Sequence, residues 1–243
     1  MRLGIMQPYF FPYLGHFSLI AACDEWIVFD ISQYTPRSWM NRNRVLHPAG
    51  GCKWVTVPLA NASIQMRTRE ATILSPADAR RSVVAHLSHY RRAPFYAAVT
   101  GLVEAAFTDD PSLTRLNVRA LAAVCRYVEL PFRYRICSEL PLALPPDLGP
   151  GDWAREICAQ LGASTYVNPA GGRALFDPAT FARSGIELQF LGAEPFPYST
   201  GRFVFEPNLS ILDVLMWNKP QAVRAAIDRY ELATAASKPA LAA

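Results

Sequence analysis

The sequence has few charged residues and no obvious metal-binding cluster. Lys, Arg, Asp and Glu make up 18% of its 243 residues, against roughly 25% in ordinary soluble domains. The five cysteines form no Cys-x-x-Cys pair and have no His-x-x-His beside them, which argues against a zinc site. Their odd number and wide spacing favour free, buried thiols in a reducing cytosol. We therefore expect a cytoplasmic protein without a metal.

Long apolar runs and familiar catalytic signatures are also missing. No stretch has about 20 consecutive apolar residues, and Pro8 and Pro12 interrupt the first apolar run, so we expect neither membrane insertion nor a signal peptide. There is no internal repeat, no Walker loop and no G-x-S-x-G elbow. A net charge of +4 fits RNA or a phosphorylated small molecule equally well.

The composition that remains is that of a well-packed α/β domain. Half of the residues, 51%, are hydrophobic and 12% are aromatic, which favours a packed core over disorder. Residues 2–6 are typical of a buried strand, 17–25 of helical turns and 26–30 of a second strand. This succession predicts a Rossmann-like βαβ unit at the amino terminus of a mixed sheet.

The rest of the chain predicts one domain over residues 1–232, with a helical insert at about 76–129 and a flexible tail at 233–243. Polar and aromatic residues at 31–44 indicate a loop or irregular excursion. Further strands are expected within 52–59, 62–74, 131–140, 164–169 and 185–192. Further helices are expected at 152–163, 177–182 and 209–218, the last being the final helix of the main fold.

Two polar segments should follow the first two strands at the ligand-binding edge of the sheet. The first contains Gly15 and His16 at a helix start, where some nucleotidyl-transferring proteins bind ATP phosphates. A structural histidine with a satisfied hydrogen bond is the alternative. The second begins at Asp30, a candidate for proton transfer.

Residues 30–44 concentrate donors and stacking groups. Arg37 and Arg42 suit phosphate or carboxylate. Gln33, Asn41 and Asn43 could orient a sugar or an amide, and Trp39 offers a stacking surface. The alternative is a solvated loop whose arginines pair with surface acids.

Three further candidates lie later in the chain. His89 follows His86 by three residues on a predicted helix, which fits an acid/base or a structural role. Asn168 stands before a Gly-Gly turn that would let backbone approach a ligand. Asp213 either completes a capping box with Ser210 or binds substrate.

Several motifs together carry a resemblance to a known family. They are "MQPYFFPY" (6–13), "NRNR" (41–44), "YVNP" (166–169) and "LSI" (209–211) with Asp213. The chain resembles the WbqC-like proteins, which are encoded among genes for bacterial O-antigen and related glycans. The resemblance implies transfer of an amino acid, glycine in particular, to an amino sugar.

We therefore expect an acyl or aminoacyl transferase acting on an amine. Its partners would be a small molecule (an amino sugar, a sugar nucleotide or another amine) and an activated acyl donor such as an aminoacyl-tRNA or a carrier protein, with no DNA. Protons would be moved by His16, Asp30 or His89. The expected substrate-binding residues are Gln7, Tyr9, Tyr13, Gln33, Arg37, Trp39, Asn41, Arg42, Asn43, Asn168 and Asp213.

Two other classes of function stay open. The first is a nucleotidyltransferase or adenylate-forming amide ligase, with ATP as its cofactor bound at the Gly-His pair. The second is a non-catalytic binding module of a glycan-assembly complex.

Overall fold

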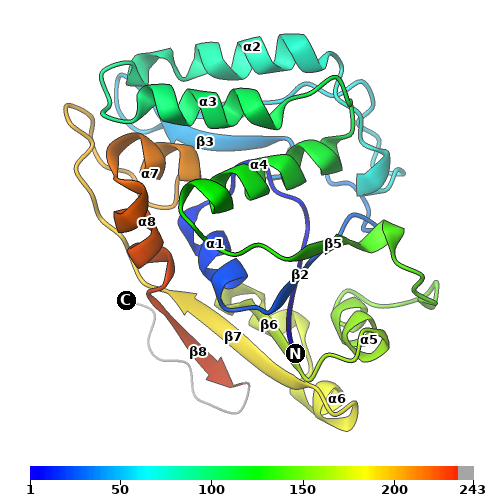
Figure 1. Ribbon diagram of the computed structural model, residues 1–243. Coiled ribbons are helices and arrows are strands. Elements are labelled where there is room, and N and C mark those ends of the chain that lie inside the picture. Colours follow the sequence, from blue (N-terminus) through cyan, green and yellow to red (C-terminus); the bar gives the residue numbers. More distant parts are fainter. Residues whose placement is uncertain (235–243) are drawn as a thin grey trace.

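The computed structural model describes residues 1–234, which form a six-stranded mixed sheet with helices on both faces (Figure 1). The sheet order is β5-β2-β1-β6-β7-β8. Neighbouring strands are parallel, except that β8 runs antiparallel to β7. The predicted α/β class is confirmed. The strand bounds are β1 Arg2–Met6, β2 Glu25–Val28, β5 Tyr134–Ile136, β6 Thr165–Pro169, β7 Glu187–Ala193 and β8 Tyr230–Thr234.

The order of the strands reverses beside β1. From β1 the chain passes through helix α1 (Leu14–Ala21) to β2, and β5 then extends the sheet on that side. After helix α5 (Asp152–Gln160) it returns to the opposite side of β1 as β6. In open α/β sheets, the crevice at such a reversal is where ligands bind.

Alternating side chains of the strands build two hydrophobic layers. Leu3 and Ile5 of β1 pack with α5 and α6 (Pro178–Arg183) on one face of the sheet. Trp26 and Val28 of β2 belong to the cluster on the other face, with α1, α4 (Leu113–Tyr127) and α8 (Pro220–Ile227). Both faces of the sheet are therefore covered.

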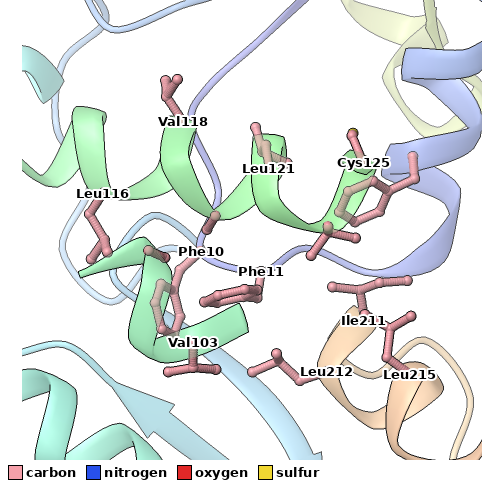
Figure 2. Close-up of a cluster of buried hydrophobic side chains, with 14 of the residues drawn as sticks. Phe10, Phe11, Val103, Leu116, Val118, Leu121, Cys125, Ile211, Leu212 and Leu215 are labelled. Atoms are coloured by element: carbon pink, nitrogen blue, oxygen red, sulfur yellow. The ribbon is translucent and has the colours of Figure 1, made fainter. Parts of the chain in front are cut away.

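The region predicted as helical, 76–129, contains α2 (Pro76–His86), α3 (Tyr96–Ala106) and α4. These helices share a buried cluster with the amino-terminal loop. Phe10 and Phe11 are fully buried, and Figure 2 shows them between side chains of α3, α4 and α7 (Ile211–Trp217). The cluster thereby connects the helical region to the segment that follows β1.

The stretch 31–44 was predicted to be a loop or irregular excursion, but part of it is a strand. Its end belongs to strand β3 (Arg42–Leu46), which pairs antiparallel with β4 (Cys52–Thr56) in a separate two-stranded sheet. In β3, Asn43 and Val45 point into the protein, while Arg42 and Arg44 stay partly exposed. Because the outward-facing side chains of β3 are arginines, the sequence analysis did not recognise the two-residue alternation of a strand.

Three other expectations are corrected. The strand expected within 62–74 is absent, and this segment has only a 3-10 turn, Thr68–Glu70, and isolated bridges such as Leu59 with Ile73. The helix at 209–218 is not the last, because α8 and β8 follow it. Cys52 is exposed rather than buried, and Cys23 is only half-buried. The other 3-10 turns are Ser88–Tyr90, Cys137–Glu139 and Ala170–Leu175.

Part of the predicted tail, residues 233 and 234, belongs to β8, and the remainder, 235–243, lies outside the described residues. Within residues 1–234, no helix is both long enough and apolar enough to cross a lipid bilayer.

Candidate functional site

A cavity of about 700 Å³ opens where the strand order reverses. Met6 and Gln7 reach it from the end of β1, and Asn168 and Pro169 reach it from the end of β6. Its position is the one expected for the ligand site of an open α/β sheet. Its size lies within the range of small-molecule and cofactor pockets. We call it the switch-point cavity.

The amino-terminal aromatic segment has two functions in this architecture. Tyr9 and Tyr13 line the switch-point cavity, whereas Phe10 and Phe11 are buried in the hydrophobic cluster. This separation requires a sharp turn, and Phe11 adopts a left-handed backbone conformation with φ of 39°. Such a conformation is uncommon for a bulky residue, so the surrounding contacts must hold it.

Buried amide and hydroxyl groups hold this turn through its carbonyl oxygens. The Asn43 side-chain nitrogen donates to the carbonyls of Phe10 (3.0 Å) and Phe11 (2.9 Å). Ser210 Oγ also donates to the Phe11 carbonyl, at 2.7 Å, and Asn117 donates to the Pro8 carbonyl at 2.8 Å. Three elements distant in sequence thereby fix the wall of the cavity.

A stack of arginines and tryptophans stands at the rim. The guanidinium carbon of Arg44 lies 5.3 Å from the centre of the Trp39 ring, and that of Arg42 lies 3.9 Å from the centre of the Trp54 ring. The ring centres of the two tryptophans are 5.2 Å apart. We call these four residues the Trp–Arg ladder. Trp39 and Arg44 also line the switch-point cavity.

Arg44 is the only cationic side chain in the described cavity wall. Its Nε is buried without a hydrogen-bond partner, and no carboxylate within residues 1–234 forms an ion pair with it. A guanidinium in this state is able to bind an anionic group.

Another part of the cavity wall is aromatic. Phe29, after β2, packs against Trp153 of α5 with ring centres 5.7 Å apart. Tyr166 of β6 lies 5.4 Å from Phe176, and both rings line the cavity. The sequence analysis missed this wall, because the residues come from four separate segments. The position of Trp153 at a helix start after a Pro/Gly-rich loop was the available signal.

Six of the predicted substrate-binding residues line the cavity: Gln7, Tyr9, Tyr13, Trp39, Asn43 and Asn168. Gln7 donates to Ser32 Oγ at 3.0 Å, and its side-chain oxygen accepts from Tyr9 at 3.4 Å. One N–H of the Gln7 amide has no partner among these contacts, so it could bind a ligand.

Asn168 is held by its neighbours at the end of β6. Its side-chain oxygen accepts from the Tyr166 hydroxyl at 2.9 Å, and its nitrogen donates to the Pro169 carbonyl at 3.0 Å. A methyl group on Gly172 would fall well inside contact distance of this nitrogen, whereas one on Gly171 would meet open space.

We expect Gly172→Ala to lower the free energy of unfolding by about 1 kcal/mol, because the Asn168 side chain must move and its buried hydrogen bonds weaken. Gly171→Ala is the matched control and should stay within about 0.5 kcal/mol of the wild type. Urea unfolding of the three proteins measures both. Equal losses in both variants would show that Asn168 is not packed against Gly172.

Four other predicted residues lie outside the cavity wall and organise the loop instead. Gln33 donates to the Ile64 carbonyl at 2.5 Å, and Arg42 donates to the Arg37 carbonyl at 2.5 Å. Asn41 accepts from the Tyr34 hydroxyl at 3.2 Å and donates to the Val57 carbonyl at 3.0 Å. Of the nearby arginines, the structure brings Arg44 to the cavity, rather than Arg37 or Arg42.

The candidates for proton transfer do not line the switch-point cavity either. Both ring nitrogens of His16 are buried without a partner, and burial lowers the pKa of His16 to about 3. Asp30 accepts from the backbone N–H of Ser138 at 2.9 Å and from its hydroxyl at 2.7 Å, and burial raises the pKa of Asp30.

His89 lies in the 3-10 turn Ser88–Tyr90, and Asp213 lies in α7. The His89 ring packs 4.0 Å from that of Tyr90, and burial lowers the pKa of His89 to about 4. Asp213 is fully buried and accepts hydrogen bonds from the hydroxyls of Tyr90 (2.5 Å) and Tyr198. Burial raises the pKa of Asp213. The two phenols supply the partners that a buried carboxyl requires.

The cavity wall is therefore equipped to bind and position rather than to supply a strong base. Among its described residues there is no Asp, Glu, His, Lys or Cys. Burial raises the pKa of Tyr9 and Tyr13, so both phenols stay protonated and can donate hydrogen bonds at neutral pH. Residues 1–234 also contain no group of three His, Cys, Asp or Glu side chains arranged to hold a metal ion.

Fold and site together define an α/β protein with a cavity at a reversal of strand order. The chain belongs to the WbqC-like protein family, whose model matches residues 7–225. It is 29% identical over 218 residues to "Uncharacterized protein Rv1507c" of Mycobacterium tuberculosis, an alignment that covers 88% of this chain and 92% of the relative. No solved structure matches the chain significantly.

Proposed function

We propose that the protein is a transferase of bacterial O-antigen or related glycan synthesis, acting in the cytoplasm. It joins an acyl group, in particular a glycyl group, to an amine of a phosphorylated or sugar substrate. The observation that carries this proposal is Arg44, an unpaired cation in the wall of a large cavity whose described lining has no carboxylate. Such a cavity selects an anionic substrate.

The make-up of the wall favours an acyl donor that is already activated. The amine nitrogen attacks the carbonyl of an ester or thioester, a C–N bond forms, and the C–O or C–S bond breaks. The leaving oxygen or sulfur takes up the proton that the amine loses. This reaction needs orientation and hydrogen-bond donors for the developing oxyanion, and it needs no protein nucleophile. The Tyr13 hydroxyl and the second N–H of the Gln7 amide are such donors.

An ATP-using ligase or nucleotidyltransferase is the second candidate. Sites for a nucleoside triphosphate usually combine carboxylates for Mg²⁺ with several cations or a loop of backbone N–H groups. The described wall of the switch-point cavity offers one arginine and no acid. His16, the proposed contact for ATP phosphates, is buried outside this wall and stays neutral at pH 7.

Turnover assays separate these candidates. The protein is incubated with a panel of amino-sugar nucleotides and either a pre-charged glycyl ester or thioester, or glycine with ATP. A mass gain of one glycyl residue with the pre-charged donor alone is expected. A gain that requires ATP would favour the ligase, and binding of the sugar without any gain would favour a binding module.

We expect Arg44→Ala to weaken binding of the phosphorylated substrate about tenfold, because one charge-assisted contact is lost. Arg183→Ala removes the same charge from the surface of α6 and should leave binding unchanged. Calorimetric titration of the three proteins with an amino-sugar nucleotide tests this. Equal affinities for all three would place the anionic group away from Arg44.

A further inference from the structure

The positive charge of this chain is concentrated in one segment. Between Asp30 and Glu70 the sequence contains six of the 24 Lys and Arg residues and none of the 20 acids. The rest of the chain has 18 basic and 20 acidic residues, so its net charge is −2 against +4 for the whole. Segregation of this kind is the electrostatic signature of a surface for a polyanion.

Part of this charge is presented on one face of the β3–β4 hairpin. Arg44 stands opposite Trp54 across the strand pair, and Arg42 precedes it by two residues on the same face. Trp54 is 40% exposed and Trp39 is 38% exposed, which is unusual for indoles and places the Trp–Arg ladder at the surface. Arg37 is exposed at the same end of β3, where its carbonyl accepts from Arg42.

The Trp–Arg ladder is continuous with the switch-point cavity. Trp39 and Arg44 belong to both, while Arg42 and Trp54 extend the surface outward from the rim. A chain-like polyanion on the ladder would therefore have one end at the mouth of the cavity. This geometry suits a donor whose reactive group sits at the end of a polymer.

We propose that the Trp–Arg ladder binds the single-stranded 3′ end of an RNA and delivers an aminoacyl ester on its terminal ribose to the switch-point cavity. This inference rests on the proposed function and names its donor. Bases of single-stranded RNA stack on indoles and on guanidinium planes, and arginines neutralise the phosphates between them. An acidic carrier protein would use the arginines, but it would leave two exposed indoles without a role.

The reaction balances without a further co-reactant. The amine nitrogen of the acceptor forms a bond to the ester carbonyl carbon, and the bond between that carbon and the ribose oxygen breaks. The ribose hydroxyl is restored with the proton that the amine gives up. The RNA leaves with a free 3′ end.

The experiment measures binding of a short, unacylated single-stranded RNA by fluorescence anisotropy. The wild type is compared with Arg42→Ala, Trp54→Ala and, as control, Arg183→Ala on α6, which lies far from β3 in Figure 1. Each ladder variant should weaken binding about tenfold, and the control should bind like the wild type. The logarithm of the affinity should fall with the logarithm of salt concentration with a slope of about −1.4, as for two phosphates of a single strand neutralised by the two arginines of the ladder.

Other outcomes would overturn the proposal. It fails if polyphosphate of equal charge binds as tightly as the RNA, because the indoles would then contribute nothing. It also fails if an acidic acyl-carrier protein binds with ladder dependence and RNA does not. Trp54→Phe, which keeps an aromatic ring, should bind within about threefold of the wild type and guards against a folding defect in Trp54→Ala.

The inference and the proposed function can fail separately. Glycyl transfer from a small thioester without ladder-dependent RNA binding would remove the RNA and leave the transferase. Ladder-dependent RNA binding without transfer to any amine would leave the nucleic-acid site and remove the transferase.

Discussion

At pH 5 the free energy of unfolding is expected to be about 2 kcal/mol lower than at pH 7 through His16 alone. His16 is fully buried against Trp26 and Tyr9, with ring centres 5.0 and 5.7 Å away, and burial lowers its pKa from 6.5 to about 3. The unfolded chain takes up a proton below pH 6.5, whereas the folded protein does not. The contribution of neutral His16 to the free energy of unfolding is therefore fully present above pH 6.5 and is lost as the pH falls toward 3.

The variant His16→Phe isolates this effect. Phenylalanine fits an aromatic environment of similar shape, so we expect a stability at pH 7 close to that of the wild type. At pH 5 the free energy of unfolding of the variant should then exceed that of the wild type by about 2 kcal/mol more than at pH 7. Burial raises the pKa of Asp30 and Asp213, which acts in the opposite direction, but equally in both proteins.

Urea unfolding at the two pH values provides the measurement, and turnover of the variant adds a second readout. If the difference in the free energy of unfolding between wild type and variant is the same at both pH values, the imidazole is not desolvated. Loss of turnover in a stable His16→Phe variant would support the catalytic role that the sequence predicted for this residue.

The location of the cavity was accessible to reasoning from sequence. The carboxyl ends of parallel strands meet at one edge of a sheet, and this rule alone places Gln7 and Tyr9 near that edge. Asn168, at the end of the third strand, reaches the same edge because β6 returns beside β1. The polar segment after β2 contributes Trp39 and Asn43 to the same cavity.

The sequence did not reveal which of the arginines lines the cavity, because this depends on strand pairing. Arg42 and Arg44 share the outer face of β3, and only the stacking on Trp54 and Trp39 distinguishes their positions. The hairpin itself was predicted only in part, since an outer face of arginines does not show the usual apolar alternation of a strand.

The burial of His16 was not accessible to reasoning from sequence for a similar reason. A histidine at a helix start gives no sign in sequence of whether the ring faces solvent or the core. Here the apolar neighbours of His16 in α1 are packed against the sheet, and the imidazole is buried with them. Long-range packing, rather than local pattern, decides which polar residues meet the ligand.

Replacing Asn43 by aspartate is expected to lower the free energy of unfolding by about 4 kcal/mol, more than the loss of about 2 kcal/mol expected for Asn43→Ala. Aspartate has the shape of asparagine but, when ionised, only accepts hydrogen bonds. In this site it would face the carbonyl oxygens of Phe10 and Phe11, at the positions where the amide now donates. Asn43 is 4% exposed, so water cannot compensate the charge.

Asn61→Asp is the matched control, because the Asn61 amide also donates to a backbone carbonyl, that of Glu70 at 2.8 Å, but in an exposed loop. Its cost should stay below about 1 kcal/mol, since solvent screens the new charge. Urea unfolding ranks the variants, and equal losses for Asn43→Asp and Asn43→Ala would mean that the amide does not hold the two carbonyls. This ranking is expected because the left-handed turn at Phe11 persists only while its carbonyl is hydrogen-bonded. The turn directs Tyr9 and Tyr13 to the cavity and the two phenylalanines to the core.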